Sequence, residues 1–531
     1  MTNAVSIVRS LLIYGLCLPF AVYLGYIIAQ PMDRPSFVVV AIALMLPLVP
    51  VLLKWHHFIL IVSWNMSMVL FFFPGSPSLC IIMSLVSFTL SIVQHILVRQ
   101  MKFLSVPSVI LPLIFLTFVI VITANLTGGI GIRVLGGESY GGKRYVVLLG
   151  AIIGYFALTS HRVPPGKEFL YVAVYYLGAL TALMGSFAPW FPSSLHFIFT
   201  LFPVENLRAL AEGNTPGGGL YLRLGGLTFG TLAVAYYILA RHGLNGTINL
   251  TERWRFLPFQ FRNGFVVNQP WRFMIFLGVF VVSLMGGYRS IPLTMGLLLL
   301  IQFYLEGLFR SRLVPVLIVV GVMTAVLIIP FSNKLPYSIQ RSLSFLPLNI
   351  DPIVRMDAET SAEWRLNIWR NVIPTIPKYL VVGKGYSIDP RELEMSNDLA
   401  VFNNSGFEAG ATVASDFHNG PLSVIIPLGI FGAIGFLWFL AASIRCLLFN
   451  YRYGEPRLRL INTFLLASFT AKMIFFFVVF GAFYSELAIF TGMIGLSICI
   501  NGGMRRPLPV TASKPAPVPP FRFPKPARPI A

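Results

Sequence analysis

The chain contains 531 residues and carries a formal net charge of +20, yet only 11% of its residues are charged and 56% are hydrophobic. Its mean hydropathy of +0.79 leaves too little polar surface to cover a soluble fold, so the composition excludes a water-soluble globular protein and indicates lipid as the solvent. All four cysteines fall inside apolar stretches without a Cys-x-x-Cys spacing, which argues against disulfides and thiolate metal sites.

Apolar blocks near the length of about 20 residues that a helix needs to cross a bilayer follow one another along the chain. They predict an all-α polytopic membrane protein with about fourteen transmembrane helices, because transmembrane barrels give short alternating segments instead. The first block follows Arg9 and lacks a good cleavage site at its end, so we expect an uncleaved signal anchor. The predicted spans lie near residues 11–29, 36–53, 57–73, 79–98, 107–125, 145–160, 169–188, 224–240, 273–287, 290–309, 313–331, 421–444, 461–483 and 486–500.

The charges between these blocks predict their orientation. With the N-terminus inside, the cytoplasmic segments contain 23 Lys and Arg against four acidic residues, whereas the outside segments contain 15 of each. The positive-inside rule then places both termini in the cytoplasm. Because the positive charge borders helix ends, it indicates anionic lipid headgroups as its partner and argues against nucleic acid.

Four parts of the chain follow from this topology. Residues 1–331 hold transmembrane helices 1 to 11, and residues 332–420 form one large extracytoplasmic loop that contains short helices. Residues 421–500 hold helices 12 to 14. Residues 501–531 contain nine prolines and no acidic residue, which predicts a disordered basic cytoplasmic tail.

Two arginines fall at predicted outer helix ends, where the charge bias disfavours them. Arg223 precedes the span near residue 224, and Arg289 lies in the sharp turn between the ninth and tenth spans. Each is either a snorkelling interface residue or a binding group for an anion, because a planar guanidinium makes paired hydrogen bonds to phosphate.

The loop at 332–420 is unusually long for a connection and too rich in Trp, Leu and Ile to be disordered, so we expect it to be functional. Within it, residues 362–373 place Trp364 and Trp369 near one another at helical spacing, with Arg365 beside them. This pattern predicts a helix that lies at the membrane interface. The tryptophans are either interface anchors or part of a site, and the two roles are compatible.

His418 is the only histidine in this loop, and it precedes a span in which Pro421 suits the first helical turn. Such an imidazole is either a polar interfacial residue or a proton-transfer group. The remaining histidines show no spacing typical of metal ligands, so we predict no metal site; they are His56, His57, His95, His161, His196 and His242.

Lys472 falls near the centre of the predicted span at 461–483, where a charge costs at least about 2.5 kcal/mol. Either Lys472 faces the bundle interior with an unnamed partner, or the helix begins at Met473 and Lys472 lies at the cytoplasmic interface.

Several of these segments follow one another in a specific order: Arg223 with Gly226, Tyr288-Arg289-Ser290, Arg365 with Trp369, Pro377 with Gly383-Lys384-Gly385, and His418-Asn419 followed by Gly429 and Gly432. In this order and spacing, residues 220–440 resemble the O-antigen ligase and O-antigen polymerase superfamily of bacterial surface-polysaccharide enzymes. The chain departs from the family pattern at Tyr288, where serine is usual, and at Ser290, where glycine or another small residue is.

The resemblance implies a glycosyltransferase in the bacterial inner membrane that moves a glycan from undecaprenyl diphosphate to a sugar hydroxyl at the periplasmic face. On this basis, His418 is the expected general base, and Arg223 and Arg289 are expected to bind the diphosphate, with Arg365 as a secondary candidate. The implied partners are the carrier-linked glycan donor, a glycolipid or glycan acceptor and membrane lipids, without a cofactor or a metal.

Two questions stay open at this level. A polytopic transporter of an anionic or glycolipid solute is the main alternative, although the sequence lacks the paired halves with broken helices that many transporters have. Ligases and polymerases share the same signature, so the acceptor, the sugars and the oligomeric state are not predicted.

Overall fold

A computed structural model of the chain describes residues 49–98, 103–130, 141–204, 224–248, 270–311, 313–392, 394–396 and 410–506, together with isolated positions before residue 49 and one strand pair. The strands β1 (Arg253–Arg255) and β2 (Val266–Asn268) pair antiparallel. Arg223, the predicted first span, most of the second and the tail beyond residue 506 lie outside the described residues.

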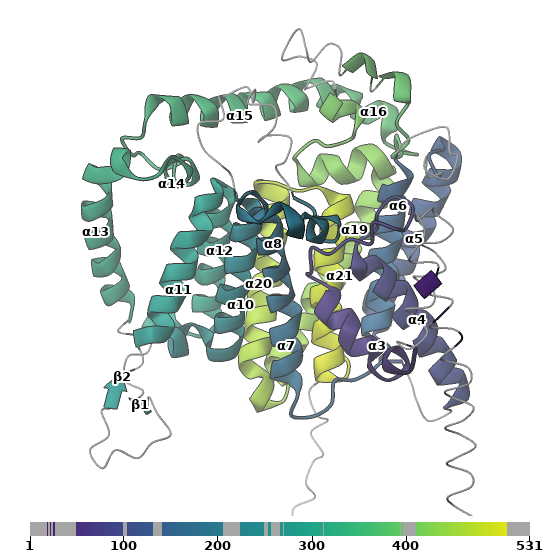
Figure 1. Cartoon of the computed structure of the whole chain (residues 1–531), viewed down its shortest axis with the longest axis horizontal. Helices are drawn as coiled ribbons and strands as arrows, with labels where there is room; N and C mark the ends of the chain where they lie inside the picture. The colour runs from purple at the N-terminus through teal and green to yellow at the C-terminus, as the bar shows by residue number, and fades with distance from the viewer. Residues whose placement is uncertain are drawn as a thin grey trace, which may run out of the picture.

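Most of the described chain is a bundle of long helices, with further helices laid across one end (Figure 1). The main helices are α3 (Val49–Ser63), α4 (Leu79–Leu97), α5 (Pro107–Thr127), α6 (Gly142–Leu158), α7 (Glu168–Leu177), α8 (Ala182–Ser186), α10 (Gly225–Ile248), α11 (Pro270–Ser283), α12 (Ser290–Leu305), α13 (Leu313–Phe331), α14 (Tyr337–Ser342), α15 (Pro352–Val372), α16 (Ile376–Tyr379), α19 (Gly420–Tyr453), α20 (Arg459–Val478) and α21 (Phe483–Asn501). We call the end of the bundle on which α15 lies the loop end.

Seven helical segments of the described chain are long and apolar enough to cross a membrane, and three shorter apolar helices accompany them. The seven are Leu79–Leu97, Pro107–Thr127, Glu168–Ser186, Leu317–Lys334, Gly420–Tyr453, Pro456–Val478 and Phe483–Asn501. The protein is therefore a helical multi-pass membrane protein. The total of fourteen spans, the sides of the termini and the periplasmic position of the loop stay predictions.

One predicted boundary is wrong. Helix α3 runs through residues 54–56, where we expected two spans to separate, and residues 64–78 form turns and a bridge between Val69 and Ser78 instead of continuing the span predicted at 57–73. Two polar residues of this stretch find partners on other helices, so the helix continues through it. His56 Nδ1 lies 2.9 Å from Ser87 Oγ, and His57 Nε2 lies 2.9 Å from the Leu158 carbonyl oxygen, so both imidazoles are buried within the bundle.

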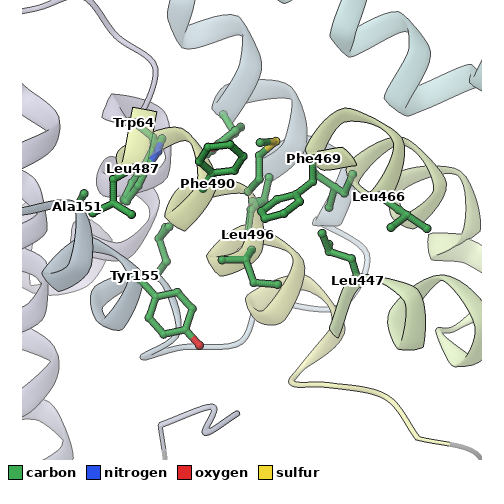
Figure 2. Packing of buried hydrophobic residues seen from close by; sticks show 14 of the residues in the cluster. Trp64, Ala151, Tyr155, Leu447, Leu466, Phe469, Leu487, Phe490 and Leu496 are labelled. Atoms are coloured by element: carbon green, nitrogen blue, oxygen red, sulfur yellow. The ribbon is translucent and has the colours of Figure 1, made fainter. Parts of the chain in front are cut away.

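The core of the bundle lies around α21, which packs extensively against α6 and also contacts α19 and α20 (Figure 2). Phe490 and Leu496 of α21 are fully buried. Trp64 donates a 3.1 Å hydrogen bond to the Ala488 carbonyl, and its indole lies so close to Gly492 that a Cβ there would overlap it. Glycine at position 492 therefore permits α21 to approach the residue that follows α3.

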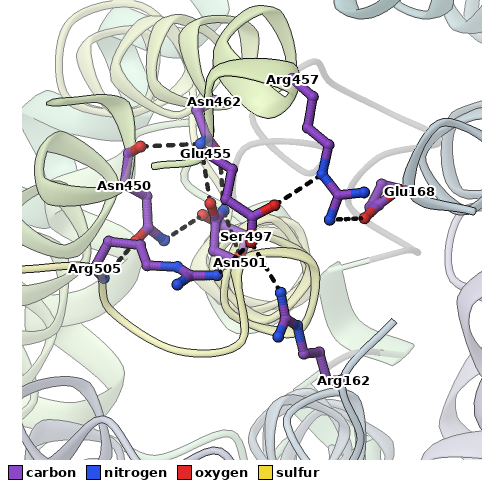
Figure 3. Close-up of polar contacts among 9 residues, drawn as sticks. All are labelled: Arg162, Glu168, Asn450, Glu455, Arg457, Asn462, Ser497, Asn501 and Arg505. Atoms are coloured by element: carbon purple, nitrogen blue, oxygen red, sulfur yellow. Dashed lines mark hydrogen bonds and ion pairs between the residues drawn. The ribbon is translucent and has the colours of Figure 1, made fainter. Parts of the chain in front are cut away.

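At the end of the bundle opposite α15, ion pairs join the chain segments that follow α6, α19 and α21 (Figure 3). Glu455 pairs with Arg162 at 3.1 Å, with Arg457 at 2.8 Å and with Arg505 at 2.9 Å, and Arg457 also pairs with Glu168 at 3.0 Å. A hydrogen-bonded group of polar side chains lies beside them and comprises Asn450, Asn462, Ser497 and Asn501. These contacts join the ends of α6, α19 and α21.

Lys472 lies inside α20, and the structure identifies its partner. Its Nζ donates a 2.8 Å hydrogen bond to Glu486 Oε1 in the first turn of α21, and the Glu486 side chain is only 7% exposed. The prediction of a paired lysine facing the bundle interior is confirmed, and the alternative in which the helix begins at Met473 is wrong because α20 begins at Arg459.

We expect Lys472→Met to lower the stability of the protein by about 2.5 to 3.5 kcal/mol, because Glu486 would be left as an unpaired charge within the bilayer. The midpoint of thermal unfolding in detergent micelles measures this effect. The double variant Lys472→Met/Glu486→Leu should recover most of the loss, since it removes both charges. Equal loss in the single and double variants would contradict a role for the ion pair.

Candidate functional site

The short turn between α11 and α12 presents Arg289 at the loop end. Gly287 has φ of +70°, a left-handed conformation that suits glycine, and Arg289 is the N-cap residue of α12. A Cβ at Gly286 would overlap the Thr228 hydroxyl, so the turn packs closely on α10. Arg289 is half-buried and in a fixed turn, as a binding arginine requires.

Arg341, on α14, holds this turn from the loop side. Its Nη1 donates a 2.7 Å hydrogen bond to the Gly287 carbonyl, and its Nε forms a buried ion pair with Asp357 of α15. The neighbouring Ser342 hydroxyl donates to the Leu284 carbonyl at 2.8 Å. Sequence reasoning missed Arg341, because its carboxylate partner lies 16 positions along the chain and no local pattern announces the pair.

Arg365 lies on α15 within electrostatic reach of the other two arginines, and we call Arg289, Arg341 and Arg365 the arginine cluster. Burial lowers the pKa of Arg365, and the positive charges of Arg289 and Arg341 lower it further. Its Nε is buried and makes no hydrogen bond with the described residues. A group of neighbouring guanidinium side chains is suited to bind an anion that carries several charges.

His418 lies directly before α19 in a strained conformation, with φ of +49°. The next residue, Asn419, caps the helix, and its side chain accepts a 3.1 Å hydrogen bond from the Leu422 amide. The imidazole lies between the rings of Trp364 and Phe480, at centroid distances of 5.1 and 5.2 Å. The backbone and two aromatic rings thus fix the orientation of the imidazole.

The charges around His418 have opposite effects on the pKa of its imidazole. Burial lowers its pKa, the Asp416 carboxylate raises it, and Arg365 lowers it. Nδ1 lies 3.8 Å from Asp416 Oδ1, too far for a hydrogen bond, and is buried. Since the net pKa is below the usual value of about 6.5, His418 is neutral at pH 7 and can accept a proton.

Helix α15 docks on the start of α19 through its tryptophan side. Ile368 and Val372 pack with Phe417 and Leu422 in a small buried cluster. Trp369 Nε1 donates a 2.8 Å hydrogen bond to the Phe417 carbonyl, one residue before His418. The predicted helix at 362–373 is confirmed up to Val372 as part of α15, and its tryptophans contact the protein at the candidate site. Its position at the membrane interface stays a prediction.

The Gly383-Lys384-Gly385 turn packs against a kink in α19, a role that the sequence did not predict. Helix α19 is kinked, with Gly429 at φ of +66°, and the turn fills the kink. The amides of Lys384 and Gly385 donate to the Ile426 and Pro427 carbonyls at 2.7 and 3.0 Å. This segment of the loop is therefore built into the helix bundle.

Four histidines from three parts of the sequence form a group that does not include His418. The rings of His56, His57 and His95 lie 5.4, 5.5 and 5.6 Å from that of His161. All four imidazoles have hydrogen bonds to the protein. Within the described ranges, no group of three or more His, Cys, Asp or Glu is placed to hold a metal ion.

The structure thus brings three of the predicted and one unpredicted residue together at the loop end. Arg289, Arg365 and His418 were predicted, Arg341 was not, and Arg223 lies outside the described residues. A comparison with protein families matches residues 265–437 to the O-antigen ligase family. This range contains the arginine cluster and His418. A comparison with curated proteins finds no matching relative.

Proposed function

We propose that the protein is a polyprenyl-diphosphate-dependent glycosyltransferase, because residues 265–437 match the O-antigen ligase family. It transfers a glycan from undecaprenyl diphosphate to a sugar hydroxyl at the periplasmic face of the bacterial inner membrane. The observation that carries this proposal is the position of Arg365 on α15, directly after Trp364, whose ring lies 5.1 Å from that of His418, and on the same helix as Asp357, which pairs with Arg341 of the arginine cluster.

In the proposed reaction, the acceptor hydroxyl oxygen attacks the anomeric carbon of the donor glycan. The bond between that carbon and the diphosphate oxygen breaks, and the carrier leaves as undecaprenyl diphosphate. His418 takes the proton of the hydroxyl through the ring nitrogen that does not face Asp416, and Asp416 stabilises the imidazolium that forms.

The arginine cluster stabilises the diphosphate leaving group. Arg289 and Arg365 bind the diphosphate oxygens, on which negative charge grows as the glycosidic bond breaks. Arg341 is neutralised by Asp357 and holds the turn of Arg289. Arg223 is proposed as a further diphosphate ligand from the start of α10, on the basis of the family pattern alone.

The proposal is tested by surface glycan in a deletion strain that is complemented with variants. Arg289→Ala and His418→Ala should fail to restore the glycan at normal protein levels, whereas Arg370→Ala, at an exposed position on α15, should restore it. If both site variants restore normal glycan, the enzymatic proposal fails. Purified protein in detergent micelles distinguishes the transporter alternative, because only an enzyme forms product without a closed compartment.

The same strain separates ligase from polymerase. Loss of a polymerase leaves single repeats on the surface glycolipid, whereas loss of a ligase accumulates unattached polymer on its carrier. Either outcome is compatible with the arginine cluster and His418.

The acid limb of the pH profile of kcat/KM should shift in opposite directions in the variants Arg365→Gln and Asp416→Asn. Neutral His418 is required, so kcat/KM rises with pH through its pKa. Arg365→Gln removes a charge that lowers this pKa, so the acid limb should shift to higher pH. Asp416→Asn removes a charge that raises it, so the acid limb should shift to lower pH.

The measurement is kcat/KM of the purified enzyme between about pH 4 and 8, a range that brackets the usual histidine pKa. Arg370→Gln serves as the control for loss of a positive charge on the same helix. Shifts of both variants in one direction would exclude His418 as the titrating base.

A further inference from the structure

A second positive group lies at the loop end, apart from the arginine cluster. Arg144, in the first turn of α6, has its guanidinium 4.6 Å from the ring centroid of Tyr484 and 5.7 Å from that of Tyr386. It also donates a hydrogen bond to the Ala414 carbonyl. Arginine stacked on aromatic rings keeps part of its fork available for a planar anion.

Lys384 adds a second positive charge to this group. Burial lowers its pKa, and the charges of Lys378 and Arg144 lower it further against the opposing effect of Glu392. Among the described residues, no carboxylate forms an ion pair with Arg144 or Lys384. Two half-buried cations without a carboxylate partner among the described residues are suited to bind an anion.

This group is separate from the arginine cluster but adjoins the segment that carries His418. Arg144 lies on α6 and Lys384 in the turn at the kink of α19, whereas the arginine cluster lies on α14, on α15 and at the start of α12. Ala414, which Arg144 contacts, lies four positions before His418. Tyr484 lies four positions after Phe480, whose ring contacts His418.

The turn that carries Lys384 packs tightly against α5 and α6, next to Arg144. The Tyr386 amide donates a 2.9 Å hydrogen bond to the Tyr145 hydroxyl, next to Arg144, and a Cβ at Gly385 would overlap Thr127. Tyr386 is 1% exposed, and its own hydroxyl is buried without a hydrogen-bond partner. Because Arg144 lies over the Tyr386 ring, this unpartnered hydroxyl offers a further donor to an oxygen atom bound nearby.

We propose that Arg144, Lys384 and Tyr386 form a second anion subsite that binds a phosphate group on the acceptor glycan. This inference rests on the proposed function, in which the arginine cluster holds the donor diphosphate and His418 lies where the two substrates meet. The acceptor is then itself a phosphate-bearing glycolipid, either a phosphorylated oligosaccharide on a membrane lipid or a second glycan linked to a carrier diphosphate.

The test measures KM and kcat of the full-length purified enzyme with three acceptors. They are a phosphorylated core glycolipid, the same glycolipid after phosphatase treatment, and a diphosphate-linked single repeat. A charged hydrogen bond contributes about 1.5 to 3 kcal/mol, so Lys384→Gln should raise the KM for the phosphate-bearing acceptor by about 10- to 100-fold. The donor KM and kcat should stay near those of the wild type.

The preferred acceptor identifies the source of the phosphate, since only one of the two phosphate-bearing acceptors should lose affinity in the variants. The matched control is Arg370→Gln, which should leave every constant unchanged. Arg144→Lys keeps the charge but loses the paired geometry and should fall between Arg144→Gln and the wild type. If Arg144→Gln does not fold, Lys384→Gln decides alone, because its side chain has no hydrogen bond to the segment of His418.

Equal changes for the phosphorylated and phosphatase-treated acceptors would overturn the subsite and leave Arg144 as a residue that only positions residues 414–418. Unchanged constants in both variants would overturn it as well. Wild-type enzyme that transfers glycan without regard to acceptor phosphate also refutes the subsite while the proposed function stands. Wild-type protein that transfers no glycan refutes the proposed function itself.

Discussion

His418→Ala is expected to lower kcat by about 10²- to 10⁴-fold while the KM values for donor and acceptor change little. The proton of the acceptor hydroxyl must leave as the oxygen attacks, and the structure places the His418 imidazole against the rings of Trp364 and Phe480, beside Asp416. Single-turnover transfer from a carrier-linked glycan, measured with purified enzyme at saturating substrates, reports the chemical step directly.

The backbone strain at position 418 provides a control for folding. Because φ is +49° there, His418→Asn and His418→Gly should be at least as stable as the wild type, since asparagine and glycine tolerate this conformation. Both should nevertheless lose kcat as the alanine variant does. His196→Ala, at an exposed histidine elsewhere, should keep full activity. A well-folded His418→Asn enzyme with wild-type kcat would remove His418 from the chemistry.

Arg341→Met is expected to cost about 3 to 5 kcal/mol of stability, because it leaves the Asp357 carboxylate buried without its partner. The Arg341 and Asp357 side chains are only 7% and 10% exposed. The Gly287 carbonyl would also lose its donor, so the turn of Arg289 should loosen and the donor KM should rise. Thermal unfolding in micelles and steady-state kinetics measure the two effects.

A double variant separates stability from positioning. Arg341→Met/Asp357→Leu removes both charges and should recover much of the stability, but it should keep the raised donor KM because the Gly287 contact is still absent. Arg355→Met, which removes an exposed arginine from the same helix as Asp357, should change neither quantity. Recovery of both stability and donor KM in the double variant would show that Arg341 has no positioning role.

The sequence predicted best what depends on local apolar length. The spans expected at 79–98 and 107–125 correspond to α4 (Leu79–Leu97) and α5 (Pro107–Thr127), because a long apolar block needs no partner to become a helix in lipid. The prediction was wrong where polar residues are satisfied from a distance. Two spans were expected to separate at residues 54–56, but α3 runs through this stretch, where the hydrogen-bond partners of His56 and His57 lie on α4 and at the end of α6.

The candidate site was predictable only where its residues belong to local sequence motifs. The order of motifs along the chain suggested Arg289, Arg365 and His418, and the structure brings their charges together. Arg341 and Arg144 could not be inferred, since each acts through contacts with residues remote in sequence, to Asp357 and Ala414. The requirement that Lys472 have a partner was predictable, whereas its identity, Glu486 on the next helix, depends on how α20 and α21 pack.

The turn inserted in the kink of α19 limits which segments of this protein can be exchanged for those of a relative. The amides of Lys384 and Gly385 complete the hydrogen bonding of α19 carbonyls, and the Ile430 amide donates to the Leu380 carbonyl at 2.6 Å. A chimera that exchanges the loop at 332–420 with that of a relative would pair a foreign turn with a native kink. Functional exchange should therefore require residues 332 to about 453 to move as one cassette, so that loop and kinked helix are inherited together.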